Sequence, residues 1–257
     1  MTDESEPFAA YSADRSLKGK LRRRLVRLTQ RRPARIRLER PMVSFTFDDA
    51  PATATCAGAK ALEARGVRGT YYVSAGLAGR DGPMGRYATR DETMAMQAAG
   101  HELACHTYSH IDCGAAPKAA IEADVARNHD VLADWGAHEL TNFAYPYGDV
   151  SHAAKAALGA RYQVLRALNH GLIENGSDLN QAPAVGIEGP DGEATATGWL
   201  ARAMRRKAWL ILYSHDVADS PTAWGCTPDA LSRLIDAAQA GGCDIVTVAE
   251  GARRIGA

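Results

Sequence analysis

The sequence predicts an α/β fold in which parallel strands form a barrel-like sheet with helices on its outside. Seven short apolar runs of the β type occur along the chain, and helical patterns separate most of them. This alternation is typical of strand–helix–strand units, whose strands pair in parallel. The 257 residues suit one large α/β domain, which can close into a barrel at this length.

The strand candidates are residues 43–47, 69–73, 101–105, 141–145, 162–165, 209–213 and 244–248. The helical patterns are CAGAKALEARG (56–66), DETMAMQAAG (91–100), PKAAIEADVARNHDVLADWG (117–136) and TPDALSRLIDAAQAGG (227–242). All four patterns end at a glycine, one opens at a proline and one at a Thr-Pro pair, which are ordinary helix boundaries. Residues 171–198 are rich in Gly, Asn, Asp and Pro and predict a long functional loop.

The composition is that of a soluble globular protein, with 46% hydrophobic and 23% charged residues. The sequence contains no apolar run of about 18 residues, so it predicts no transmembrane helix. The N-terminus, MTDESEPFAAYSADRS, has no apolar segment of the kind found in signal peptides. The five cysteines are scattered and form no C-x-x-C pair, which indicates reduced thiols. We therefore expect a cytoplasmic protein.

A basic arm precedes the predicted domain. Residues 15–40 hold 12 Lys/Arg and a single acid. Leu17, Leu21, Leu25 and Leu28 fall on one face of a predicted helix that Pro33 should end. This amphipathic helix, residues 15–32, is compatible with packing on the body, with binding to an anionic inner-membrane surface, or with self-association. We expect no nucleic-acid partner, because the arm has no aromatic residues and no nucleic-acid motif follows it. We therefore place the arm at residues 1–40 and the predicted α/β domain at residues 41–257.

Ionisable side chains follow the first and third strands. Asp48 and Asp49 come directly after residues 43–47, and His106 and His110 come after residues 101–105. Carboxyl ends of parallel strands share one edge of the sheet, which is where function gathers. Two histidines and one carboxylate form a common catalytic zinc site, and the second carboxylate can then act as general base. Taken alone, the Asp pair is also compatible with a solvated turn or a helix N-cap, and the His pair with chance spacing.

Two further strand ends carry candidate residues. The segment AYPYGD (144–149) predicts a loop of defined conformation that exposes aromatic residues. It is also compatible with an ordinary turn. ILYSHD (211–216) ends in His215, which is a candidate general acid or a structural histidine.

The motifs TFDD (46–49), HTYSH (106–110), YPYG (145–148) and LYSHD (212–216), in this order, resemble those of the polysaccharide deacetylase family, carbohydrate esterase family 4. That family includes chitin, chitooligosaccharide and peptidoglycan N-deacetylases. The resemblance covers about residues 41–250 and implies a deformed (β/α)7-type barrel with a divalent metal. Zinc is the usual metal, and cobalt and nickel accept the same ligands.

The resemblance also implies roles for individual residues. Asp49, His106 and His110 match the metal ligands, and Asp48 matches the catalytic base. His215 matches the general acid, and Tyr147 matches the residue whose backbone N–H stabilises the oxyanion. Leu212 and Tyr213 fall where the family builds an apolar wall for the acetyl methyl group. The aromatic side chains of Tyr145 and Tyr147 favour a sugar as the substrate.

The sequence departs from the family pattern at three places, the mildest of which is Ala50-Pro51 where Gly-Pro is frequent. The third motif commonly has Arg two residues before its Pro, where this chain has Ala144. Our hypothesis is that Arg166, at the end of YQVLR, reaches Asp48 from the next strand. No segment matches the fourth motif, an Asp–Trp pair that supports the general acid, so the residue that orients His215 is not predicted.

The expected activity is therefore the removal of N-acetyl groups from N-acetylglucosamine-type residues of an acetylated glycan. A cytoplasmic enzyme meets such a glycan before export, for example as a lipid-linked precursor. We therefore expect an enzyme of exopolysaccharide biosynthesis, similar to bacterial deacetylases of adhesive holdfast-type N-acetylglucosamine polymers. The alternatives are an O-acetyl esterase or a small-amide hydrolase of the same family, and a catalytically inactive carbohydrate-binding scaffold.

Overall fold

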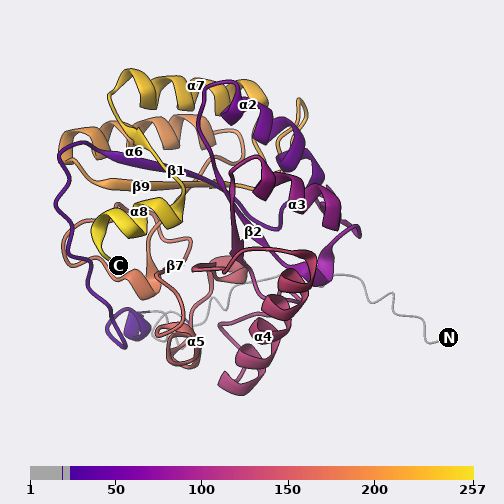
Figure 1. Cartoon of the computed structure of the whole chain (residues 1–257). Coiled ribbons are helices and arrows are strands. Elements are labelled where there is room, and N and C mark those ends of the chain that lie inside the picture. Colours follow the sequence, from indigo (N-terminus) through magenta and orange to yellow (C-terminus); the bar gives the residue numbers. More distant parts are fainter. Residues whose placement is uncertain (1–18, 20–23) are drawn as a thin grey trace.

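The computed structural model describes residue 19 and residues 24–257, and its centre is a curled parallel sheet (Figure 1). The strand order is β7–β6–β5–β2–β1–β9–β8, and β10 pairs beside the start of β1. The strands are β1 Met42–Phe47, β2 Thr70–Val73, β5 Glu102–Cys105, β6 Asn142–Ala144, β7 Val164–Arg166, β8 Val185–Gly186, β9 Trp209–Ser214 and β10 Asp244–Ile245. The predicted deformed barrel of parallel strands is confirmed.

Most helices lie on the outside of this sheet, where α4 packs on α5, α6 on α7 and α2 on α7. Helix α8 instead packs into the cluster that contains Met42 and Trp209. The bounds of the helices are α2 Ala59–Glu63, α3 Arg90–Ala98, α4 Lys118–Trp135, α5 His152–Leu158, α6 Gly192–Arg206, α7 Pro228–Ala240 and α8 Val248–Ile255. Short helical turns are η1 Ala54–Gly58, η2 Ala75–Leu77, η3 Pro146–Gly148 and η4 Leu179–Gln181, and a hairpin joins β3 Asp81–Gly82 to β4 Gly85–Arg86.

The helix boundaries follow from the capping residues. Thr89 and Glu92 form a capping box at the start of α3, and Thr227 caps α7 before its first-turn proline. Helix α4 ends at Gly136, whose φ of 98° is readily reached only without a side chain.

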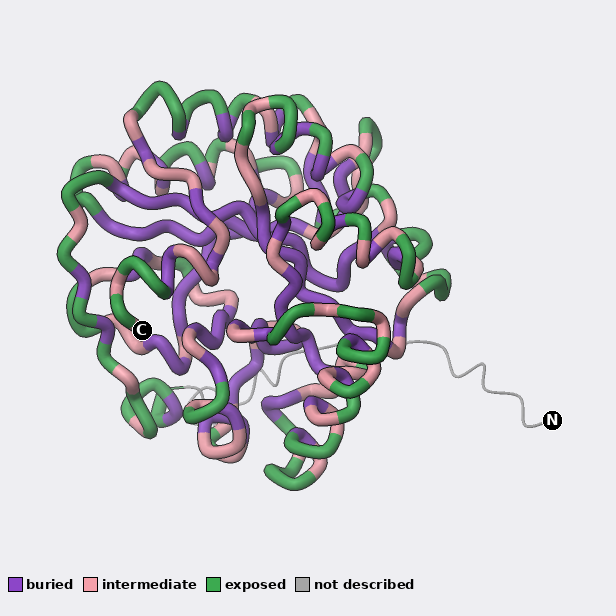
Figure 2. The backbone as a smooth tube through the Cα atoms, viewed as in Figure 1, coloured by how far each residue is buried: buried purple, intermediate pink, exposed green. Residues whose placement is uncertain are grey.

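Strand β1 lies next to β9 in the middle of the sheet and contributes to both of its faces (Figure 1). Phe45 and Phe47 join the core cluster under the helices, whereas Met42 joins a second cluster on the other face. On that second face Ser44 accepts a hydrogen bond from the Trp209 indole at 3.0 Å. Because strand side chains alternate, the polar residues of β1 point into the curl of the sheet. Buried backbone fills the centre of the molecule in Figure 2.

Each of the seven predicted strand segments contains a strand, and the four helical patterns coincide with helices. The predicted loop of residues 171–198 also contains β8 and the first residues of α6. Helices α5 and α8 were not predicted, because each is only seven or eight residues long.

The described part of the basic arm begins with a turn that buries a different side chain from those predicted. Leu25 and Leu28 are 51% and 72% exposed, and Val26 is buried instead. The Lys155 ammonium lies beneath this turn, where it donates to the carbonyl of Val26 at 2.9 Å and pairs with Asp178 at 2.7 Å. This part of the arm is therefore held by a buried ion pair of the body.

Residues 15–18 and 20–23 of the predicted helix 15–32 lie outside the described residues. Where it is described, helical backbone ends at Val26, well before Pro33. Residues 32–36 continue as an extended segment hydrogen-bonded to residues 175–179. None of the helices in the described ranges is both long and apolar enough to cross a membrane.

Candidate active site and metal centre

The ends of β1 and β5 bring three ligand atoms together, as the sequence predicted. One ligand atom each from Asp49, His106 and His110 lies within 4.8 Å of the others. Asp49 Oδ1 is 3.5 Å from His106 Nε2 and 3.3 Å from His110 Nε2. Despite this proximity, Asp49 Oδ1 is buried with no hydrogen-bond partner among the described residues. A buried, unpaired carboxylate oxygen facing two imidazole nitrogens suits a divalent cation.

Hydrogen bonding and burial prepare both imidazoles for this role. His106 Nδ1 lies 2.8 Å from the carbonyl oxygen of Ala144, so Nδ1 carries the proton and Nε2 keeps its lone pair. Burial lowers the pKa of His106 and His110 to about 4, so both rings are neutral at neutral pH. Burial also raises the pKa of Asp49, a shift that a bound cation would oppose.

The backbone around the cluster is strained in a consistent way. Positive φ angles occur at Asp49 (61°), Ala50 (47°), Thr107 (64°), His110 (58°) and Tyr147 (58°). These are five of the seven non-glycine residues with positive φ in the described ranges. Such conformations cost about 1–3 kcal/mol each and persist where the surrounding structure imposes them. Their concentration at the predicted motifs marks this edge of the sheet as the functional site.

Asp48 lies beside the cluster and is paired with Arg166. Arg166 Nη2 donates to Asp48 Oδ1, and both side chains are buried. Burial alone would raise the pKa of Asp48, but Arg166, His106 and His215 together outweigh it and hold that pKa below its usual value. Asp48 is therefore an anion at neutral pH, as a proton acceptor requires.

The loop after β9 places His215 near Asp48 and Asp49. Its Nδ1 lies 3.2 Å from the carbonyl oxygen of Trp224 and 3.7 Å from Glu188 Oε2. The longer separation makes the Glu188 contact an interaction of charges rather than a hydrogen bond. Burial lowers the pKa of His215, but Glu188, Asp48 and Asp49 more than offset it and raise that pKa to about 9.

Glu188 is a site residue that the sequence analysis missed. It follows β8 by two residues, and its Oε1 accepts a hydrogen bond from the Tyr213 hydroxyl at 2.9 Å. The only sequence signal was a carboxylate two residues beyond a strand, and that strand was itself hidden in the predicted loop.

The remaining predicted residues fall into two groups. The Tyr147 ring packs edge-on against His110, with 4.5 Å between centroids, and Tyr213 packs near His215 and Arg166. Tyr145, by contrast, is 1% exposed and donates its hydroxyl to the Asn180 carbonyl, so it presents no surface to a substrate.

Leu212 and Tyr213 cannot form one wall, because neighbouring strand residues point to opposite faces. Leu212 belongs to the core cluster under the helices, and Tyr213 belongs to the cluster on the other face of the sheet. The expected apolar wall is thus reduced to Tyr213.

Comparison with known proteins agrees with this geometry. The sequence profile described as polysaccharide deacetylase matches residues 35–164, about half of the chain. The chain belongs to the polysaccharide deacetylase family. It carries the intact Asp–His–His triad of a metal-dependent deacetylase, at Asp49, His106 and His110.

One curated protein illustrates the likeness in sequence. The probable peptidoglycan-N-acetylglucosamine deacetylase of Arthroderma benhamiae is 28% identical over 213 residues, which are 81% of this chain and 43% of the relative. The chain therefore spans less than half the length of that curated relative.

Two solved structures share the fold. One is the Xyl-CE4 domain of a multidomain xylanase from the hindgut metagenome of Trinervitermes trinervoides, with a TM-score of 0.59, 18% identity, and coverage of 85% of this chain and 92% of that one. The other is a family 4 acetyl xylan esterase from Clostridium thermocellum in complex with cobalt, with a TM-score of 0.58, 21% identity, and coverage of 81% and 89%.

Proposed function

We propose that this deacetylase hydrolyses the N-acetyl groups of N-acetylglucosamine-type residues in a bacterial exopolysaccharide or its lipid-linked precursor. The products are acetate and a free amine. The observation that carries the proposal is the triad of Asp49, His106 and His110, the first two of them buried, with Asp48 and His215 as charged neighbours. A buried anionic carboxylate and a half-buried cationic imidazole next to one metal site provide the base and the acid that amide hydrolysis requires.

The metal triad suits a divalent ion, for which we propose zinc, and the ion supplies positive charge that polarises the acetyl carbonyl and acidifies water. Asp48 accepts a proton from water as the water oxygen bonds to the carbonyl carbon. The backbone N–H of Tyr147 donates to the oxyanion that develops on the carbonyl oxygen. His215 then gives its proton to the nitrogen as the carbon–nitrogen bond breaks.

Two further side chains position these groups. Arg166 holds Asp48 in its ionised form and fixes its direction, because Nη2 donates to one carboxylate oxygen. The Trp224 carbonyl lies against Nδ1 of His215, so Nε2 is the ring nitrogen that can face a substrate. Glu188 favours the protonated imidazole through its negative charge.

The first test is acetate release from N-acetylglucosamine oligomers by the purified chain, with amine formation followed in parallel. We expect equal amounts of acetate and amine, loss of both with a chelator, and recovery with zinc. Acetate without new amine from O-acetylated glycans would instead identify an esterase. Bound metal with no turnover on acetylated glycans or small amides would leave a carbohydrate-binding scaffold.

We propose that the protein is a cytoplasmic enzyme and that its basic arm contacts the surface of the inner membrane. Leu25 and Leu28 are exposed apolar side chains, and exposed Arg24, Arg27 and Arg31 lie along the same segment. Apolar side chains among arginines favour the interface of an anionic membrane. A lipid-linked substrate at that surface would be brought close to the active site.

Vesicle co-sedimentation tests this contact. We expect the chain to pellet with vesicles that contain phosphatidylglycerol and to stay in solution with phosphatidylcholine alone. The double variant Leu25→Ser, Leu28→Ser should pellet less. Equal pelleting of that variant and the parent, or a shift of the parent to dimers in solution without lipid, would replace membrane contact with self-association.

A further inference from the structure

The loop that joins β9 to α7 is folded around one buried carboxylate, that of Asp216, which directly follows His215 in the sequence. Asp216 is 3% exposed. Its Oδ2 accepts the backbone N–H of Thr222 at 2.8 Å, and its Oδ1 accepts the Thr222 hydroxyl at 2.5 Å. A buried carboxylate is costly unless donors satisfy it, and hydrogen bonds to an ionised group are stronger than neutral ones. Asp216 therefore fixes the position of Thr222 relative to the end of β9.

The rest of the loop is fitted to this pair of hydrogen bonds. The Thr222 hydroxyl oxygen also accepts the backbone N–H of Trp224 at 3.3 Å. The backbone carbonyl of Asp216 accepts the N–H of Cys226 at 3.0 Å and closes the loop at its base. A Cβ atom on Gly225 would lie 2.4 Å from Asp216 Oδ1, so a side chain at that position would displace the carboxylate. The loop is therefore held in one path from Thr222 to Cys226.

One carbonyl oxygen, that of Trp224, connects this loop to His215. It accepts the backbone N–H of His215 at 3.1 Å and lies 3.2 Å from ring atom Nδ1. Glu188 Oε2 is farther from Nδ1, at 3.7 Å. The carbonyl therefore fixes the direction of the imidazole ring, whereas Glu188 contributes negative charge.

We propose that Asp216, Thr222 and Gly225, called here the Asp216 clamp, are positioning residues for the general acid. The clamp holds the Trp224 carbonyl against Nδ1 of His215 and thereby directs Nε2 at the nitrogen of the acetamide. Its residues act through His215, because both oxygens of Asp216 already accept from Thr222 and the carboxylate is buried. The inference rests on the proposed function, in which the proton on Nε2 moves to the nitrogen as the carbon–nitrogen bond breaks.

Thr222→Val removes the clamp hydroxyl at nearly constant shape and without a change of charge. We expect kcat for acetate release from N-acetylglucosamine oligomers to fall by about fivefold, because the loop loses two hydrogen bonds and His215 loses its fixed direction. Thr222→Ser keeps the hydroxyl and should restore kcat to within about twofold of the parent chain. Gly225→Ala keeps every hydrogen-bonding group but forces Asp216 aside, so it should lose at least as much as Thr222→Val.

The matched control is Asp219→Asn, which removes a carboxylate from an exposed position of the same loop. Its kcat should stay within about twofold of the parent. A second substrate separates positioning from a general defect. The phenolate of para-nitrophenyl acetate leaves without a proton from the acid, so Thr222→Val and Gly225→Ala should hydrolyse this ester within about twofold of the parent. Equal losses on the amide and the ester, or a parental kcat of Thr222→Val on the amide, would overturn the clamp.

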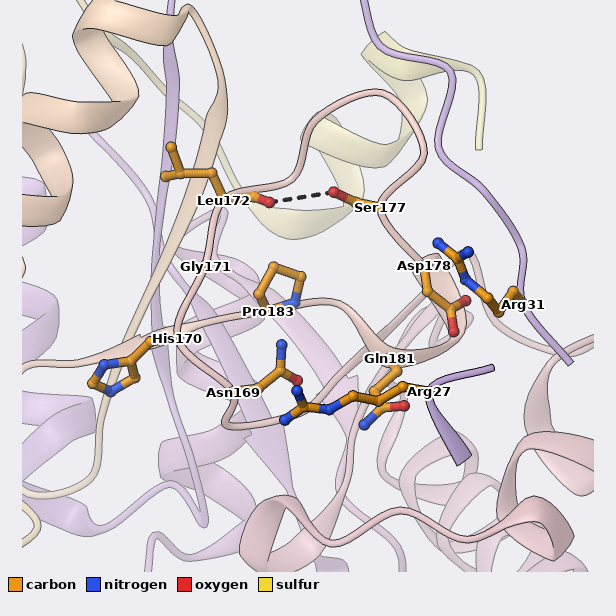
Figure 3. Close-up of a pocket in the computed structure, with 10 residues that line it drawn as sticks. All are labelled: Arg27, Arg31, Asn169, His170, Gly171, Leu172, Ser177, Asp178, Gln181 and Pro183. Atoms are coloured by element: carbon orange, nitrogen blue, oxygen red, sulfur yellow. Dashed lines mark hydrogen bonds between the residues drawn. The ribbon is translucent and has the colours of Figure 1, made fainter. Parts of the chain in front are cut away.

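Proton NMR of the His215 ring gives a readout that needs no turnover. A ring N–H that donates to a carbonyl exchanges slowly with water, so the parent chain and Thr222→Ser should show an Nδ1–H signal that His215→Gln lacks. Thr222→Val and Gly225→Ala should broaden or lose this signal. The exposed ring of His170 is the internal reference, whose protons should exchange rapidly in every variant. Figure 3 shows His170 beside a cavity of about 280 Å³ whose lining contains no residue of the clamp.

The two readouts distinguish failure of this inference from failure of the proposed function. An Nδ1–H signal that is missing from the parent, or unchanged in Thr222→Val, overturns the clamp whatever the rates. A signal that depends on Thr222, in a parent chain that releases no acetate from any acetylated glycan, would support the clamp and overturn the proposed function instead.

Discussion

Arg166, the last residue of β7, reaches across the curl of the sheet to donate a hydrogen bond to Asp48 at the end of β1. Strands β6, β5 and β2 separate the two in the sheet order. The guanidinium lies between the rings of Tyr72 and Tyr213, at 4.9 and 5.2 Å from their centres. A fully buried arginine held in this way has one anionic partner, so it fixes both the charge and the direction of Asp48.

The register explains why Arg166 can act where the family commonly uses the preceding strand. Ala144, at the position of the usual arginine, is the direct partner of Arg166 across β6 and β7. Paired residues of parallel strands point to the same face, so a side chain from either position enters the same space. The hypothesis that Arg166 reaches Asp48 therefore agrees with the structure.

Arg166→Ala should lower kcat by at least about tenfold, because Asp48 loses this guanidinium partner and its fixed direction. The double variant Ala144→Arg, Arg166→Ala should recover part of that loss, since the new arginine starts from the paired position. Steady-state rates of acetate release measure both effects. Turnover of Arg166→Ala within about threefold of the parent, less than 1 kcal/mol of barrier, would refute the role.

Asp49→Asn should abolish metal binding, because the amide keeps the shape of the carboxylate but not its charge. Metal content after dialysis against zinc should fall from near one equivalent to a background level, and acetate release should fall with it. The control is Asp134→Asn, an exposed residue of α4 that lies outside the cluster. Retention of stoichiometric zinc by Asp49→Asn would remove Asp49 from the ligand set.

Glu188→Gln should lower kcat by about tenfold and leave KM within about twofold, because the neutral amide no longer favours protonated His215. The Tyr213→Phe variant removes the hydroxyl that donates to Glu188 and should have a smaller effect. A structural defect would change KM and thermal stability together. An unchanged kcat for Glu188→Gln would show that the Trp224 carbonyl alone orients the histidine.

Most of the fold could be predicted because buried parallel strands have sequences that are short apolar runs. All seven apolar runs identified in the sequence contain strands. Strand β8 was missed since it is two residues long and lies among Gly, Pro and Asp. Helix α6 begins GEATATG, a composition closer to a loop than to a helix. Its identity as a helix depends on burying Ala196, Leu200 and Ala203 against the body.

The site was predictable where its residues share a short segment or follow a strand. His106 and His110 stand in one motif, and Asp48 and Asp49 are adjacent. The sequence could not show that Glu188 is a partner of His215. The two residues lie in different loops, and only folding brings Glu188 Oε2 to 3.7 Å from His215 Nδ1. Leu25 and Leu28 were predicted to share a helix face, but the turn after Val26 leaves both exposed.

His129 should make the protein less stable in mild acid. Its Nε2 lies 2.7 Å from the Tyr162 hydroxyl, and burial, together with Arg161, lowers its pKa to about 4. The unfolded chain has the ordinary value of about 6.5, so between these values the unfolded state binds more protons and stability falls as the pH falls. His129→Gln should flatten this slope in urea titrations between about pH 7 and about pH 5. The exposed His138→Gln should leave the slope unchanged.

Trp224 should contribute to binding of oligomers rather than to chemistry. Its carbonyl lies against the His215 ring, so its backbone borders the active site, and its side chain is 49% exposed. A large exposed aromatic surface next to the general acid can pack on a sugar ring of a neighbouring residue of the glycan. Trp224→Ala keeps the carbonyl, so kcat should stay within about twofold while KM for N-acetylglucosamine oligomers rises severalfold. With N-acetylglucosamine alone KM should be unchanged, since no neighbouring ring is present. A fall in kcat with KM unchanged would assign Trp224 to the support of His215 and not to the glycan.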